Sequence, residues 1–200
     1  MRCSLRWVLA HCALIAAGCS SDPVHYHSLV RLPASLGSEM IAPKVMLDMR
    51  PVRVPAMVDR SELVVRQANG DTALLERDLW ISPLQDELSS ALSLELARRL
   101  TGPPPLPPGQ SARRLIVRVD VQRFEGELGR YAMIEAQWRL STGASSPHPD
   151  VTCRSLHVQP APGGVAQLVE AYRRSTAALA DDIASTGGRL LATDDTHCGI

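Results

Sequence analysis

Five cysteines and six histidines are the residues of this 200-residue chain with the most obvious reactive chemistry. Neither Cys-x-x-Cys nor His-Glu-x-x-His, two spacings that commonly hold zinc, occurs in the sequence. The nucleophile motif Gly-x-Ser-x-Gly and the glycine-rich phosphate loop are also missing. His157 falls in a predicted strand without an evident catalytic partner. We therefore expect no enzyme, no cofactor and no metal site, with a catalytic group assembled from distant residues as the alternative.

Cys19 has the clearest chemistry, because it directly follows a predicted signal peptide at residues 1–18. The apolar stretch 7–17 is shorter than the roughly 18 residues that span a bilayer comfortably. Ala16-Ala17-Gly18-Cys19 resembles the bacterial lipobox, in which small residues precede a cysteine that receives a diacylglycerol thioether. We expect lipidation of Cys19; an ordinary secretory signal with an incidental cysteine is the alternative.

The residue after Cys19 bears on location. In lipoproteins of this type an Asp at that position usually signals retention in the inner membrane, and this chain has Ser20 instead. The resemblance implies a lipid anchor in the outer membrane of a Gram-negative envelope, on its periplasmic face. Residues 19–42 are predicted to form a lipidated tether, with room for an early strand around residues 24–32.

Cys153 and Cys198 are the two cysteines that remain, since Cys3 and Cys12 leave with the predicted signal peptide and Cys19 takes the lipid. An even pair in an oxidising compartment favours a disulfide. Two free thiols are one alternative, and a zinc site that adds His197 is another, although no ligand spacing supports it.

The composition is that of an ordinary globular chain. Lys+Arg and Asp+Glu are 21 each, so the chain has no basic surplus for a nucleic-acid backbone, and no nucleic-acid partner is expected. Hydrophobic residues make up 45% and charged residues 21%, which excludes wholesale disorder. Residues 43–200 are predicted to form a single domain.

Two helices are predicted. The first follows Ser82-Pro83-Leu84-Gln85, which fits a capping box with Ser82 at the N-cap and Pro83 at the first helical position. Leucines four residues apart then make one apolar stripe: Leu84, Leu88, Leu92, Leu96 and Leu100. The second helix is predicted to begin after Gly163-Gly164 and to end at Gly187-Gly188.

Period-two alternation predicts strands on both sides of the first helix. Before it we expect strands at 44–54, 62–66 and 72–75, the last two joined by a two-residue turn at Asn69-Gly70. After it we expect strands at 115–122, 132–140 and 151–159, with residues 125–130 turning the chain. The order β-β-β-α-β-β-β-α predicts an α+β fold: a two-layer sandwich with a mostly antiparallel or mixed sheet and both helices on one face.

One segment carries a family resemblance. Val54-Pro-Ala-Met-Val-Asp-Arg-Ser-Glu-Leu-Val-Val-Arg66, followed by Leu79-Trp-Ile-Ser-Pro-Leu84, resembles the PqiC-like (YmbA-like) auxiliary lipoproteins of ABC-type envelope transport systems. Their pattern runs approximately V-x-L-P-x-x-L-D-R-x-x-[LI]-V-x-R and later R-W-A-x-P-L. The matching positions are Pro55, Asp59, Arg60, Leu63, Val64, Arg66, Trp80, Pro83 and Leu84, and the departures are Met57, Val58, Leu79 and Ser82.

The resemblance implies a non-enzymatic outer-membrane lipoprotein subunit of an MCE/ABC-type lipid transport system. Such a subunit docks a periplasm-spanning protein with mammalian-cell-entry (MCE) domains, as a ring of copies in one arrangement, and supports envelope integrity. A stand-alone periplasmic lipoprotein that binds a lipid or other apolar solute in its own pocket is the alternative.

The motif segment is where we expect the specific contacts with the partner, at Pro55, Asp59, Arg60 and Arg66. For Asp59 and Arg60 the alternative is a turn cap and a surface charge. Trp80 is predicted to be a core anchor rather than a lipid contact.

Overall fold

Seven strands in one sheet and two helices make up the described part of the chain, which is residues 23–31, 45–100, 113–143, 150–193 and 195–198 of a computed structural model. The strands are β1 (His25–His27), β2 (Val45–Met49), β3 (Glu62–Arg66), β4 (Thr72–Trp80), β5 (Arg113–Glu127), β6 (Tyr131–Ser141) and β7 (Val151–Pro160). The helices are α2 (Leu84–Leu100) and α3 (Val165–Thr193). After β1 the order is the predicted β-β-β-α-β-β-β-α, and the α+β prediction is confirmed.

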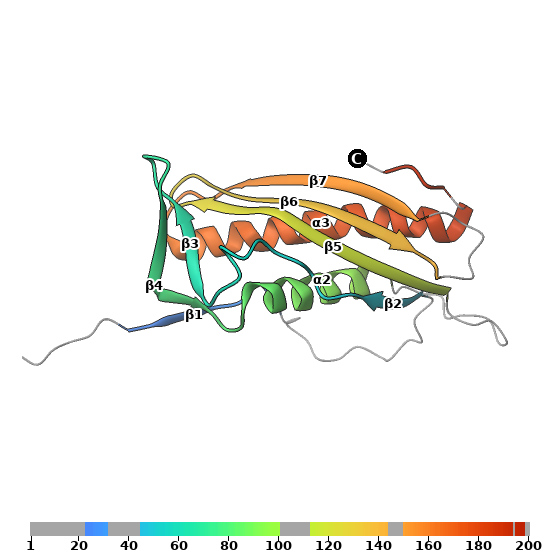
Figure 1. The fold of residues 1–200 in the computed structure, drawn as a ribbon, viewed down its shortest axis with the longest axis horizontal. Helices are drawn as coiled ribbons and strands as arrows, with labels where there is room; N and C mark the ends of the chain where they lie inside the picture. Colours follow the sequence, from blue (N-terminus) through green and yellow to red (C-terminus); the bar gives the residue numbers. More distant parts are fainter. Residues whose placement is uncertain (1–22, 32–44, 101–112, 144–149, 194, 199–200) are drawn as a thin grey trace, which may run out of the picture.

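The sheet is mixed, and β5 organises it. Its strand order is β1-β4-β3-β5-β6-β7, with β2 paired to β5 outside this path. β5, β6 and β7 pair antiparallel over most of their lengths, whereas β2 runs parallel to the start of β5. The far end of β5 meets β3 through Arg66, opposite Glu127 (Figure 1).

Alternation along the central strands gives the sheet two different faces. On β6, Ala132, Ile134, Ala136, Trp138 and Leu140 are buried on the helix side, as their spacing predicts. The opposite side of β5, β6 and β7, which we call the open face, carries many arginine and carboxylate side chains, together with the exposed Leu156 and Val158.

Both helices lie on the same side of the sheet (Figure 1), which we call its inner face, and their apolar stripes are buried against the sheet and each other. The leucine stripe of α2 is confirmed, because Leu84, Leu88, Leu92 and Leu96 are all fully buried. The predicted end of α3 is wrong, since the helix continues through Gly187 and Gly188 to Thr193. A Cβ on Gly187 would lie 2.8 Å from Leu115 Cδ2, so this glycine permits close packing on β5 instead of ending the helix.

Two predicted turns are also corrected. In the β3–β4 connection, Gly70 N donates to Gln67 O (2.9 Å) and Gln67 N donates to Asp71 O (2.8 Å), so the loop has three residues. Gly70 takes a φ of 91°, which is typical of such a loop with a bulge. Likewise β5 extends to Glu127 and only residues 128–130 turn, because Gly126 is needed inside the strand. A Cβ there would lie 2.6 Å from the Tyr172 hydroxyl.

Part of the predicted tether belongs to the folded domain. β1 pairs parallel with the end of β4, where Tyr26 lies opposite Leu79, and Leu29 is buried in the core. Leu29 N and Ser28 Oγ each donate to Glu87 Oε2 at 2.7 Å, and Arg173 donates to Ser28 O. The early strand is therefore three residues long, and residues 28–31 dock onto α2 and α3.

Candidate functional site

The motif segment begins with a tight turn that fixes its backbone. Val58 N and Asp59 N both donate to Pro55 O, at 3.0 and 3.2 Å, and the Val58 side chain is buried. Met57, at the tip of the turn, is 67% exposed. The turn therefore presents an apolar side chain to solvent from a backbone that is held at both ends.

Asp59 caps helix α2. Its Oδ1 accepts a hydrogen bond from Gln85 N at 3.1 Å, which satisfies one of the free N–H groups at the start of the helix. The predicted capping box is wrong, because Glu87 N donates to Pro83 O and the helix starts one residue later than predicted. Pro83 therefore occupies the N-cap position, and proline has no side-chain oxygen that could accept a hydrogen bond there. The Asp59 carboxylate of the motif segment accepts it instead.

Ser82 has a different role from the predicted cap. Its hydroxyl donates to Glu87 Oε1 at 2.9 Å, while Glu87 Oε2 holds Ser28 and Leu29. The Glu87 side chain is buried, and both of its carboxylate oxygens accept hydrogen bonds from these donors. Glu87 therefore ties the segment after β1 to the start of α2.

Arg60 and Arg66 both form ion pairs within the chain. Arg60 Nε lies 3.1 Å from Glu62 Oε2 at an exposed position. Arg66 donates to Glu125 Oε2 (2.7 Å), and Tyr131 donates to the other oxygen of the same carboxylate. The hydrogen bond from Arg66, helped by those from Tyr131 and Arg123, lowers the pKa of Glu125 to about 2. Within the chain, Asp59 thus acts as a helix cap and Arg60 as a surface charge, which is the alternative stated for these two residues.

Pro55 and Arg66 line one shallow groove. Its volume is about 120 Å³, and Met57, Val58, Val64 and Phe124 provide its apolar walls. We call it the motif groove. The structure thus brings together two of the four predicted contact residues, while Asp59 and Arg60 serve the start of α2 and the approach to β3.

Trp80 is a core residue, as predicted. It is 3% exposed, and its ring lies edge-on to Phe124 and Tyr172 with centroids 6.3 Å apart in both cases. Phe124 and Tyr172 stack at 4.0 Å. This aromatic cluster lies behind the motif groove, since Phe124 belongs to both.

His157 has partners that sequence reasoning missed. His157 Nε2 lies 2.8 Å from Asp182 Oδ2, and Ser155 Oγ donates to the same oxygen at 2.6 Å. In a hydrolytic triad the imidazole must contact the serine and pass on its proton. Here the carboxylate lies between them, and Ser155 accepts a hydrogen bond from Trp138 and is buried. The cluster ties β7 to α3, and only its helical spacing from Leu179 and Ile183 hints that Asp182 borders the inner face.

Cys153 and Cys198 form the disulfide that their pairing predicted. Cys153 on β7 is bonded to Cys198, with their Cα atoms 5.8 Å apart. Both sulfurs are thereby unavailable to zinc, and His197 pairs with Asp195 at 2.7 Å instead. Within the described ranges no group of three or more metal-ligating side chains occurs. The predicted signal peptide and Cys19 lie outside the described residues.

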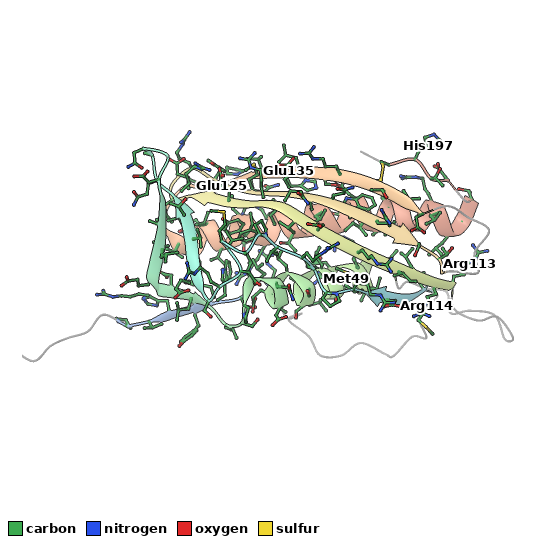
Figure 2. All side chains as sticks on the ribbon, in the orientation of Figure 1. Met49, Arg113, Arg114, Glu125, Glu135 and His197 are labelled. Atoms are coloured by element: carbon green, nitrogen blue, oxygen red, sulfur yellow. A yellow bond between two sulfur atoms is a disulfide. The ribbon has the colours of Figure 1, made fainter. Side chains whose placement is uncertain are left out.

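The open face near β3 is a network of ion pairs, which we call the paired half. Glu125 joins Arg66, Tyr131 and Arg123, and Glu135 on β6 joins Arg154 of β7. Figure 2 shows Glu125 and Glu135 over this half, with Arg113 and Arg114 at the opposite end of β5. Among the helices of the described residues, none combines the length and apolarity needed to cross a membrane.

Comparisons with known proteins agree with the sequence motif. The family described as "ABC-type transport auxiliary lipoprotein component" matches residues 31–184. The proteins named "Intermembrane transport lipoprotein PqiC" from Escherichia coli (strain K12) and Shigella flexneri are each 25% identical over 142 residues. These residues cover 68% of this chain and 74% of each relative.

Two solved structures share the fold. An uncharacterized protein has a TM-score of 0.63 at 18% identity, over 82% of this chain and 98% of its own. A protein from Xanthomonas campestris has a TM-score of 0.55 at 16% identity, over 85% of this chain and 95% of its own.

Proposed function

This chain belongs to the family of ABC-type transport auxiliary lipoprotein components, and on that premise we propose that it is a non-enzymatic docking adaptor. A lipid on Cys19 anchors it to the periplasmic face of the outer membrane. Assembled with copies of itself as a homo-oligomer, the lipoprotein holds an MCE-domain protein that spans the periplasm. In this way it supports lipid transport and envelope integrity.

The motif groove carries the docking part of this proposal. Met57 is two-thirds exposed, yet its turn is fixed by two hydrogen bonds to Pro55 O and by the buried Val58. An apolar side chain on a preorganised backbone loses little conformational freedom when a partner covers it. Arg66 at the rim adds a charged group whose position is set by Glu125. The groove is therefore suited to seat an apolar anchor residue of a partner protein.

The position of β1 supports the anchoring part. His25, the first residue of β1, lies six residue steps after Cys19, and an extended chain spans at most about 3.5 Å per residue. A lipid on Cys19 would hold the edge of the sheet within about 20 Å of the membrane surface. An adaptor at a membrane needs such a short and fixed distance, and docking of residues 28–31 onto both helices keeps it short.

The packing between the layers favours the adaptor over a solute-binding lipoprotein. The side chains that face each other across the layers, among them Ile134, Trp138, Leu168 and Leu179, are almost completely buried in one continuous cluster. The motif groove, in contrast, is bordered by the exposed Met57. An apolar solute in a pocket of its own would need space that these side chains fill.

Site-specific photo-crosslinking in intact cells tests the proposal. A photoreactive residue replaces Met57 in the full-length protein. The matched control carries the same residue at Ala192, an exposed position near the C-terminal end of α3. We expect Met57 to capture an MCE-domain protein and Ala192 to capture none. Equal capture from both positions, or none from Met57, would contradict docking through the groove.

A Cys19→Ala variant tests the anchor separately. We expect a folded protein that leaves the outer-membrane fraction and fails to restore the envelope barrier in a deletion strain. Full complementation by this variant would show that the lipid is dispensable.

A further inference from the structure

The open face carries a hollow that the proposed function does not use. Its volume is about 760 Å³, and four arginines line it: Arg50 and Arg53 from the segment after β2, Arg118 from β5 and Arg139 from β6. Asp120, Gln137 and Thr152 are also part of the lining. We call it the arginine hollow.

The strand register forces two of these arginines together. Arg118 lies directly opposite Arg139 in the β5–β6 pairing, and Arg139 lies opposite Thr152 of β7. Arg53 pairs with Asp120, one row further along. Like charges directly opposite each other in a sheet destabilise it. Functional sites are where proteins depart from the locally most stable choice of residue.

Carboxylates neutralise this hollow only in part. Arg53 lies 3.6 Å from Asp120, Arg50 lies 3.2 Å from Asp48, and Arg139 lies 4.0 Å from Asp150. Asp48 is shared, because Arg114 also donates to it at 2.5 Å. Among the described residues no carboxylate lies within 4.0 Å of the Arg118 guanidinium. Of the residues that line the hollow, four are cationic and one is anionic.

A second arginine-rich hollow differs in that every one of its arginines is paired, although five arginines share three carboxylates. Between α2 and α3, Arg98 and Arg99 share Glu95, while Arg31, Arg173 and Arg174 share Glu170. Arg99 also pairs with Asp181. Each of these guanidinium groups already has an anionic partner within the chain. This hollow serves as the control because each of its arginines, unlike Arg118, has a carboxylate within 4.0 Å.

We propose that the arginine hollow binds a phosphate group, with a phospholipid headgroup as its source. Guanidinium groups present paired N–H donors whose spacing matches the oxygens of a phosphate. The Thr152 hydroxyl and the Gln137 amide supply further donors at the same surface. The volume is within the range of about 300–1,000 Å³ that is usual for sites of small ligands. Binding at this hollow is independent of the outer-membrane docking proposed above.

The test is equilibrium binding to the purified full-length lipoprotein in nonionic detergent at constant ionic strength. The probes are inorganic phosphate and dihexanoyl phosphatidylglycerol, a short-chain soluble phospholipid. The double variant Arg118→Gln/Arg139→Gln removes the central pair. The matched control, Arg98→Gln/Arg174→Gln, removes the same charge from the hollow between α2 and α3, where Glu95 and Glu170 still pair with other arginines. Thermal unfolding of both variants verifies that they are folded.

We expect the Arg118/Arg139 variant to lose at least tenfold in affinity for the phospholipid and the control to lose less than twofold. Tighter binding of the phospholipid than of phosphate identifies the headgroup as the source. Equal affinities would retain the phosphate site but overturn the lipid source. Absence of binding to both probes, or equal losses in the two variants, would overturn the site. The Arg118/Arg139 variant could also keep its phosphate affinity and lose the crosslink from Met57 to a partner protein. That result would make the hollow a protein interface and contradict the proposal.

Discussion

The two ends of the open face use arginine in opposite ways. In the paired half, Glu125 and Glu135 each accept hydrogen bonds from arginines of neighbouring strands. In the arginine hollow, the register places Arg118 opposite Arg139, and carboxylates lie within 4.0 Å of only three of the four lining arginines. The same residue type on the same strands therefore stabilises the fold at one end and leaves surplus positive charge at the other.

A β-bulge separates these two halves. The β5–β6 register shifts between Val121 and Arg123, so that Gln122 is an extra residue in β5. A regular strand would place Phe124 on the same face as Arg118 and Gln122. The extra residue returns Phe124 to the core and places Arg123 opposite Glu135. The bulge thus brings Arg123 opposite Glu135 in the paired half, while Arg118 stays opposite Arg139 in the arginine hollow.

The largest effect is expected from the disulfide, which fastens the C-terminal segment beside the hollow. Replacing both Cys153 and Cys198 with Ala opens a loop with a sequence separation of 45. We expect a loss of about 4 kcal/mol in the free energy of unfolding, measured by urea denaturation, because the unfolded chain gains loop entropy. Hydrogen exchange should rise more at Val151–Cys153 than at the other end of β7. Equal increases along β7 would show that the disulfide does not hold the hollow half in particular.

The next effect is a pH-dependent one in the paired half. In the folded protein the pKa of Glu125 is held at about 2 instead of 4.5 by Arg66 and its other donors. Because the folded pKa is depressed, the stabilisation is fully present above about pH 4.5 and is lost as the pH falls through about 2. Glu125→Gln should therefore cost on the order of 2–3 kcal/mol at pH 7 and almost nothing near pH 2.

Urea denaturation of the two proteins at several pH values measures this gap. Asp120→Asn in the hollow half is the control, since its pairing with Arg53 at 3.6 Å is exposed and is expected to contribute less than about 0.5 kcal/mol. A gap between wild type and Glu125→Gln that does not change with pH would exclude Arg66 and Tyr131 as the source of the stabilisation.

Arg66→Gln should have a smaller effect on stability. Glu125 keeps the hydroxyl of Tyr131 and the more distant Arg123 at 3.4 Å, so we expect only part of the stability loss of Glu125→Gln. Arg66 also lines the motif groove, and crosslinking from Met57 in this background separates stability from partner contact. Normal stability with lost crosslinking would make Arg66 a contact residue only and remove it from the paired network.

The smallest effect should have the opposite sign. Arg118→Gln removes one member of the like-charge pair with Arg139, and we expect a gain of about 0.5 kcal/mol. For a chain of this length that corresponds to an increase of roughly 1–2 °C in the melting temperature. The gain should shrink at high salt, which screens the repulsion. A loss of stability comparable to that of Arg66→Gln would show that the two halves are alike.

Local patterns identified most elements but not their ends. The leucine stripe of α2 and the alternation of β6 are correct because burial on one face imposes a period on the sequence. The end of α3 and the turn after β5 were wrong for one common reason. Gly187 and Gly126 look like breakers in the sequence, yet each makes room for a bulky side chain of another element. The need for that room depends on which side chain lies opposite.

In the candidate site, too, local sequence patterns identified the residues, whereas contacts between distant elements decided their roles. The motif residues could be recognised from the sequence, but the use of Asp59 as the cap of α2 depends on a contact between positions 26 residues apart. The partnership of His157 with Asp182 spans 25 residues and needs β7 and α3 to be packed together. Neither contact has a periodic signal, because each joins two elements whose relative position is set by the core.

The sequence by itself determined the apolar faces, the order of the elements and the family motif, since these depend on residue type and on spacing along the chain. Only the tertiary structure decided which charges are paired. That outcome depends on strand register, and a single extra residue in β5 separates arginines that meet carboxylates from arginines that meet each other. Electrostatic energy depends on distance in space, and for side chains on different strands the register sets that distance.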